Sequence, residues 1–180
     1  MEVTNYQSYE NLVASTTKMY SPKIALIYVT LGLAGEVGEF YEKLNEEAPI
    51  DAIEAEFQDC LWYMAAIRTE FNLKERIDWP EPSENPTAAL LKVSIHSGAI
   101  CEQMKKYLRD DWDTEKNDFG IFPESRREKI QQRWDELLQS FVDLASIVFD
   151  KPMNEIAQGN INKLASRARR GVIHGSGDNR

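Results

Sequence analysis

Cysteine and histidine are both scarce in this chain. Its 180 residues include two cysteines, Cys60 and Cys101, and two histidines, His96 and His174. Both cysteines lie in apolar helical patterns, which favours buried free thiols over a disulfide. Neither histidine stands in the Glu-x-x-His spacing that a di-iron carboxylate bundle requires, so the sequence argues against that class of site.

Long apolar runs are also lacking. No stretch approaches the roughly 18 uncharged apolar residues of a membrane helix, and the first residues lack the basic-then-apolar order of a signal peptide. We therefore expect a cytoplasmic protein that does not enter a membrane.

Positive charge is in the minority, and the formal net charge is −9. An acidic surface repels phosphate backbones, which argues against a nucleic-acid polymer as partner. Residues 163–180 nevertheless carry five basic side chains against one acid, Asp178. A basic tail on an acidic body suits a small polyanion held partly by metal and partly by arginine, and it equally suits a solvated tail.

Helical periodicity dominates the sequence, and convincing alternating strands are absent. This pattern predicts an all-α bundle of about five to six helices in one domain over residues 1–180. The predicted helices cover approximately residues 6–16, 22–46, 51–71, 86–109, 123–149 and 152–170. Ser21 before Pro22 predicts a helix N-cap, and Asp51 with Glu54 predicts a capping box. Residues 1–71 form the predicted metal-binding half, 86–170 a second helical half, and 171–180 an irregular basic tail.

The two predicted halves show a weak similarity to each other. A Gly, a Glu and a Lys recur at one offset of 63 residues, as Gly35, Glu39, Lys43 and Gly98, Glu102, Lys106. The segment that begins at Glu56 also aligns with the one that begins at Glu136, but Ala99 and Gln139 replace Glu36 and Asp59. A degenerate internal repeat explains this similarity, and chance likeness between amphipathic helices explains it equally well.

Four carboxylates stand in two pairs, Glu36 with Glu39 and Glu56 with Asp59. A spacing of three residues places both members of a pair on one helix side, about one turn apart. The pairs lie symmetrically about the predicted turn at residues 45–49, so an antiparallel hairpin would bring all four acids to one height.

Four clustered carboxylates repel one another unless cations neutralise them, and all-oxygen ligation favours Mg²⁺ or Mn²⁺. Glycine is disfavoured inside helices, so Gly35 and Gly38 predict a packing partner or a ligand close to that helix face. The alternative is that the acids form an ordinary solvated face. Apolar neighbours such as Leu33, Val37 and Leu61 argue against it.

The pattern E36xxE39 followed by E56xxD59 resembles the signature of MazG-like nucleotide pyrophosphohydrolases, in the all-α NTP pyrophosphatase group. Surrounding words agree: YQSY near the start, LGLAGEVGEF, DCLWYMAAI, and N160-I-N-K163-L before the basic tail. The resemblance covers roughly residues 4–71 and 150–180. About 75 residues intervene where family members often have almost none, which puts the oligomeric state and the pocket walls in doubt.

The resemblance implies roles for particular residues. The four acids would hold Mg²⁺, with Mn²⁺ as a substitute, and Glu39 would orient or deprotonate the attacking water. The basic residues that would bind phosphate are Lys43, Lys163, Arg167 and Arg170. Nucleotide binding falls to Asn160, Trp62 and Tyr63, although core packing explains the two aromatic residues equally well.

The resemblance also implies the reaction, which is hydrolysis of a (deoxy)nucleoside triphosphate to the monophosphate and pyrophosphate. Among substrates, dGTP or GTP in a phage nucleotide pool comes first and house-cleaning of aberrant nucleotides second. The chain is expected to form a homo-oligomer, a dimer or a tetramer. The alternative from another class is a non-catalytic helical regulatory or interaction protein that kept the scaffold.

Overall fold

The computed structural model describes residues 2–16, 22–83, 86–113, 118–119 and 121–170. Six α-helices dominate it: α1 (Tyr6–Ala14), α2 (Pro22–Asn45), α3 (Ile50–Glu70), α4 (Ala89–Asp110), α5 (Glu124–Leu144) and α6 (Met153–Arg169). The predicted all-α class and the number of helices are therefore confirmed.

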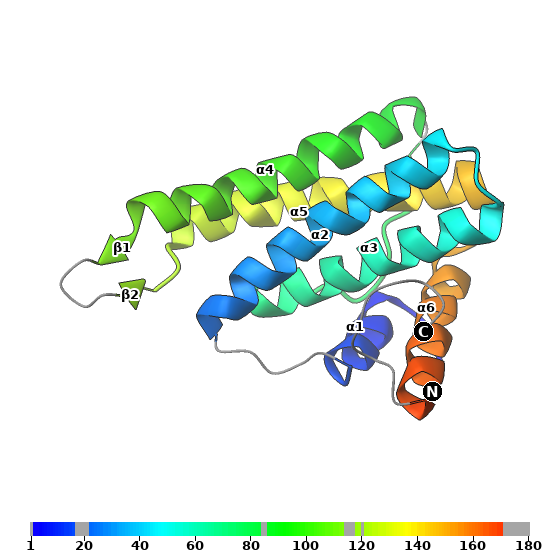
Figure 1. Cartoon of the computed structure of the whole chain (residues 1–180), viewed down its shortest axis with the longest axis horizontal. Helices are drawn as coiled ribbons and strands as arrows, with labels where there is room; N and C mark the ends of the chain where they lie inside the picture. The colour runs from blue at the N-terminus through cyan, green and yellow to red at the C-terminus, as the bar shows by residue number, and fades with distance from the viewer. Residues whose placement is uncertain (1, 17–21, 84–85, 114–117, 120, 171–180) are drawn as a thin grey trace.

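The helices form two antiparallel hairpins with two further helices at one side (Figure 1). In the first hairpin α2 packs on α3, and in the second α4 packs on α5. The hairpins join because α2 also contacts α4 and α3 contacts α5, while α1 and α6 both pack on α3. The segments that resemble each other in sequence thus fall on corresponding helices, α2 with α4 and α3 with α5. This correspondence agrees with a degenerate repeat, and chance similarity between amphipathic helices remains the alternative.

An aromatic core fixes the position of α3. The ring of Phe57 lies 5.8 Å from Phe40 of α2, 4.8 Å from Phe141 of α5 and 5.0 Å from Phe149, measured between centroids. Trp134 of α5 is fully buried and donates its indole N–H to the carbonyl of Met64 at 2.9 Å. Each such buried side chain contributes roughly 1.5–3 kcal/mol, so these contacts hold α3 firmly against α2 and α5.

The start and the capping of α3 differ from the sequence prediction. Helix α3 begins at Ile50 after Pro49, whose φ of −53° prepares the first turn, and no side chain caps it. The predicted capping box of Asp51 and Glu54 is therefore wrong. Asp51 instead lies in the first turn, where its negative charge interacts favourably with the positive end of the helix dipole. Helix α1 does carry a capping box, formed by Asn5 and Ser8, whereas the predicted N-cap Ser21 lies outside the described residues.

The segment after α4 is not wholly irregular. The two-residue strands β1 (Trp112–Asp113) and β2 (Asp118–Phe119) pair antiparallel, where a plain loop was expected over residues 110–122. A short 3-10 turn (Pro86–Ala88) precedes α4, and a π-helix (Ala145–Phe149) continues α5. The predicted irregular tail, residues 171–180, lies outside the described residues.

Helix α2 qualifies the expectation that the chain has no membrane span. From Ile24 to Asn45 it is long and apolar enough to cross a membrane by length and composition alone. Only 33% of its most apolar window is buried inside the chain. A core helix of a soluble protein meets the same criteria, so this single helix is weak evidence for a span.

Candidate metal centre

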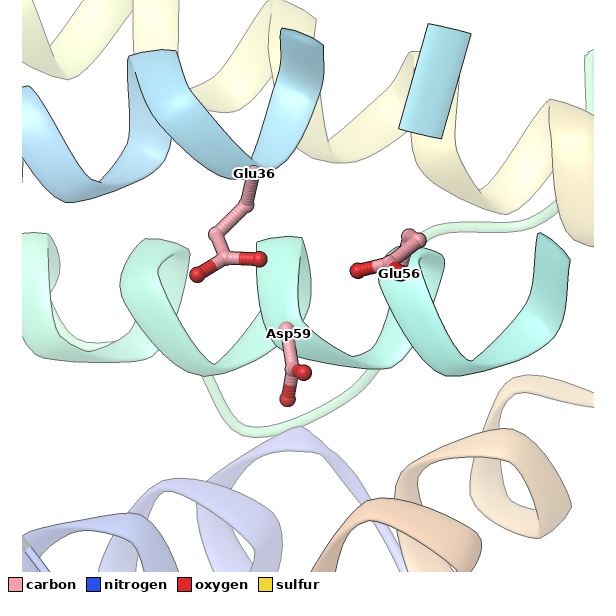
Figure 2. A group of neighbouring side chains, drawn as sticks. All are labelled: Glu36, Glu56 and Asp59. Atoms are coloured by element: carbon pink, nitrogen blue, oxygen red, sulfur yellow. The ribbon is translucent and has the colours of Figure 1, made fainter. Parts of the chain in front are cut away.

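Three of the four predicted metal ligands meet between α2 and α3 (Figure 2). Glu36 comes from α2, and Glu56 and Asp59 come from α3. One carboxylate oxygen of each residue lies within 4.8 Å of the corresponding oxygens of the other two. We call these three residues the acid cluster. The antiparallel hairpin brings Glu36 of α2 beside Glu56 and Asp59 of α3, as the symmetric spacing about the turn predicted.

Glu39 falls outside the acid cluster. Three residues advance a helix by about 300°, so the side chain of Glu39 is rotated some 60° away from that of Glu36. Glu36 is half-buried against α3, whereas Glu39 is exposed. The charge of Glu39 still reaches the site, because it is one of the charges that raise the pKa of Glu36. Its predicted roles as ligand and as catalytic residue stay predictions.

Burial makes the acid cluster costly to ionise. Glu56 is only 2% exposed. The pKa of Glu36 rises from 4.5 to about 8, first because the side chain is desolvated and then because Asp59, Glu39 and Glu56 are negative. Burial also raises the pKa of the Cys60 thiol, with smaller contributions from the charges of Glu36, Asp59 and Glu56. At neutral pH the site therefore takes up a proton unless a cation replaces it.

Lys163 of α6 supplies one positive charge directly at the acid cluster. Its Nζ lies 2.7 Å from Oδ1 of Asp59 and donates to the carbonyl oxygen of Ala55 at 3.0 Å. The sequence prediction assigned Lys163 to phosphate. The structure brings this lysine to the predicted metal ligands, paired with one of them.

Asn160 also contacts the acid cluster and is fully buried. Its Nδ2 donates to Oδ1 of Asp59 at 3.5 Å, and its Oδ1 accepts the hydroxyl hydrogen of Tyr9 at 3.0 Å. The amide predicted to contact the nucleotide thus has Tyr9 and Asp59 as partners. Sequence reasoning missed Tyr9, although the word YQSY contains it, because nothing in the spacing links residues so far apart in the chain.

The other predicted phosphate-binding residues lie at different distances from this centre. Arg167 stands one turn beyond Lys163 on α6 and is 9% exposed, and no ion pair or hydrogen bond joins it to another described residue. Arg170 is exposed and bonds the carbonyl of Ser166. Lys43 lies near the end of α2 and pairs with Glu46 at 3.8 Å. The structure therefore brings Lys163 into the site, with Arg167 next to it, but not Lys43 or Arg170.

Two half-buried aromatic residues extend from the acid cluster along α3. Tyr63 shares a hydrogen bond of 3.2 Å with Tyr28, and burial raises its pKa, with smaller contributions from Glu36 and Asp59. Its ring lies against α2 at Gly32, where an added Cβ would stand 2.0 Å from the ring. The indole of Trp62 donates to Thr16 at 3.0 Å. These contacts explain both aromatic residues by packing and leave their nucleotide contacts as predictions.

Gly35 and Gly38 have no packing partner within the described chain. A Cβ added at either position would meet no atom within 4 Å. The described residues therefore do not supply the expected packing partner, and a ligand close to this face stays a prediction.

The second half carries no comparable centre in the part of the chain that the structure describes. Ala99 and Gln139 replace two of the acids, and Glu102 forms ion pairs with its neighbours Lys105 and Lys106. Glu136 lies beside His96, with 3.0 Å between Oε2 and Nδ1. In the second half, the positions that correspond to the four acids therefore hold two uncharged residues and two glutamates with charged neighbours.

The chain is similar in sequence to a phage protein. The chain is 36% identical over 84 residues to the "Gene 37 protein" of Mycobacterium phage L5, a match that spans 47% of this chain and 67% of that protein. No known family model and no solved structure matches the chain. The name of the phage protein describes no activity. By this identity and coverage, the chain belongs to the same family as the phage L5 Gene 37 protein.

Proposed function

We propose that the acid cluster binds a divalent cation, Mg²⁺ or Mn²⁺, and that the chain hydrolyses a nucleoside triphosphate to the monophosphate and pyrophosphate. The observation that carries this proposal is the convergence of Glu36, Glu56 and Asp59 within 4.8 Å on two packed helices. The resemblance to MazG-like pyrophosphohydrolases supplies the reaction class.

The donor set suits a hard cation. All three ligands are carboxylates, and hard divalent ions prefer oxygen. Octahedral ligands of one Mg²⁺ lie about 3 Å apart when adjacent and about 4.2 Å apart when opposite, so the three carboxylates would draw closer together to bind one ion. Three ionised carboxylates carry a charge of −3, most of which a divalent ion neutralises.

When bound, the metal would polarise the α-phosphate and lower the pKa of a water molecule. The residues of the chain have separate parts in this scheme. Asn160 holds Asp59 in position, Lys163 and Arg167 provide positive charge for the phosphates, and Glu39 on the exposed side of α2 is the candidate for orienting water. The half-buried rings of Trp62 and Tyr63 are the candidates for contact with the base.

Pyrophosphate release from a panel of (d)NTPs, including dGTP and GTP, tests this function with Mg²⁺ and with Mn²⁺. Glu56→Gln removes one charge at nearly constant shape and should abolish turnover. Glu102→Gln is the control, because it makes the same chemical change outside the acid cluster. Glu102 occupies the position in the second half that corresponds to Glu39, and it is paired with Lys105 and Lys106. Turnover that persists in Glu56→Gln contradicts the proposed site.

The alternative is a non-catalytic interaction protein on the same scaffold. The open face of α2 at Gly35 and Gly38 favours it, because nothing in the described chain covers that face. Metal binding without turnover of any nucleotide in the panel would support this alternative.

A further inference from the structure

We propose that Lys163 competes with the divalent cation for Asp59, so that metal binding releases the ammonium group to the phosphates of the substrate. This inference rests on the metal binding proposed above. It assigns Lys163 two positions, one on Asp59 in the metal-free protein and one on phosphate in the metal-loaded protein.

The contacts of Lys163 show why the metal would displace it. The ammonium lies 2.7 Å from Oδ1 of Asp59, the same oxygen that Nδ2 of Asn160 approaches at 3.5 Å. A divalent ion among the three carboxylates would stand close to this ammonium, and two cations in a partly desolvated site repel strongly. Lys163 is therefore the contact of Asp59 most disfavoured by a bound metal, since Asn160 is neutral.

The surroundings allow the lysine to leave without loss of the site. Asn160 is fully buried and its amide is fixed by Tyr9, so Asp59 keeps one donor when the ammonium departs. Lys163 is attached through a flexible four-carbon stem, and its side chain is 20% exposed. Its other polar contact among the described residues is the carbonyl of Ala55, which water can replace.

The destination of the ammonium follows from α6. Arg167 stands one helical turn beyond Lys163, on the same side of the helix, and makes no ion pair with a described residue. A lysine released from Asp59 would join this guanidinium as a second cation for a polyphosphate.

The test measures Mn²⁺ binding to the full chain at one fixed pH, by titration calorimetry and by the electron paramagnetic resonance signal of free Mn²⁺. Lys163→Met should bind Mn²⁺ about threefold to tenfold more tightly than the wild type, because no internal cation must be displaced. With Mn²⁺ saturating, the same variant should bind inorganic triphosphate at least about threefold more weakly.

Two controls separate displacement from a general change in charge. Lys106→Met removes a lysine that pairs with Glu102 in the second half, outside the acid cluster, and should leave Mn²⁺ affinity unchanged. Lys163→Arg keeps the charge and should bind Mn²⁺ like the wild type. Lys163→Gln carries the same expectation as Lys163→Met and replaces it if circular dichroism shows that the methionine variant is unfolded.

Equal or weaker Mn²⁺ binding by folded Lys163→Met overturns the inference, because Lys163 would then support the metal site and not compete with it. That result leaves the proposed metal centre intact. If the wild type binds Mn²⁺ no better than Glu56→Gln, the proposed function fails and this inference fails with it.

Discussion

Tyr9 and Asn160 form a buried hydrogen bond of 3.0 Å between two helices at opposite ends of the chain. The bond determines which end of the amide faces the acid cluster. Because the Tyr9 hydroxyl donates to Oδ1, the Asn160 NH₂ group points toward Asp59. In the reverse orientation an amide oxygen would face a carboxylate. Tyr9 is thus a positioning residue for Asp59 that acts through Asn160.

Replacing Tyr9 by Phe should impair metal binding without touching a ligand. Loss of the hydroxyl should cost about 1 kcal/mol of stability. It should also weaken Mn²⁺ binding about threefold to tenfold, because residues that orient the metal ligands through hydrogen bonds affect the affinity for the metal. Tyr6→Phe is the matched control: Tyr6 is equally buried on α1, but its hydroxyl has no hydrogen-bond partner among the described residues. Calorimetric titration with Mn²⁺ compares the two, and equal affinities would contradict the positioning role.

The stability of the metal-free protein should fall as pH rises from about 5 to about 8. The carboxyl of Glu36 has a pKa raised from 4.5 to about 8, chiefly by burial, so the folded protein keeps a proton that the unfolded chain has lost. The stabilisation from this proton is complete below pH 4.5 and disappears as pH passes 8. Thermal melts in EDTA across this range measure the slope.

Removing the titrating group should flatten that slope. Glu36→Gln leaves no proton to lose, so its melting temperature in EDTA should depend less on pH than that of the wild type. Addition of Mg²⁺ at pH 8 should restore stability to the wild type and not to the variant. If the melting temperature of Glu36→Gln depends on pH as strongly as that of the wild type, the pH dependence belongs to other groups and the prediction is wrong.

Two glycines of α2 should respond oppositely to alanine. At Gly32 the added Cβ would stand 2.0 Å from the ring of Tyr63, so Gly32→Ala should cost about 1–3 kcal/mol as the ring is displaced. At Gly35 no atom lies within 4 Å, so Gly35→Ala should add up to about 1 kcal/mol of helix stability. Urea unfolding of both variants checks the difference, and a stabilised Gly32→Ala would contradict the described packing.

The sequence predicted those features that depend on local periodicity. The apolar stripes predicted the six helices to within a few residues. The symmetric spacing of the acids about residues 45–49 predicted that four acids would meet, and three of them do. The start of α3 was placed one residue late, because Pro49 can open a helix without a side-chain cap. The strands β1 and β2 escaped prediction, since two-residue strands leave no periodic signal.

Contacts between distant segments lay beyond the sequence. The sequence predicts Lys163 as a phosphate-binding residue, but its pairing with Asp59 depends on how α6 packs against α3. The spacing of Glu36 and Glu39 sets the angle between their side chains, but tertiary packing decides that Glu36 faces α3 and that Glu39 stays exposed. The buried bond between Tyr9 and Asn160 likewise depends on tertiary packing.

The most direct test of the account is Mn²⁺ binding to the wild-type chain and to Glu56→Gln, with Glu102→Gln as control, by titration calorimetry on folded protein. The account predicts binding by the wild type and by Glu102→Gln, and affinity at least about tenfold lower in Glu56→Gln. Equal affinity in all three proteins would contradict a metal centre at Glu36, Glu56 and Asp59.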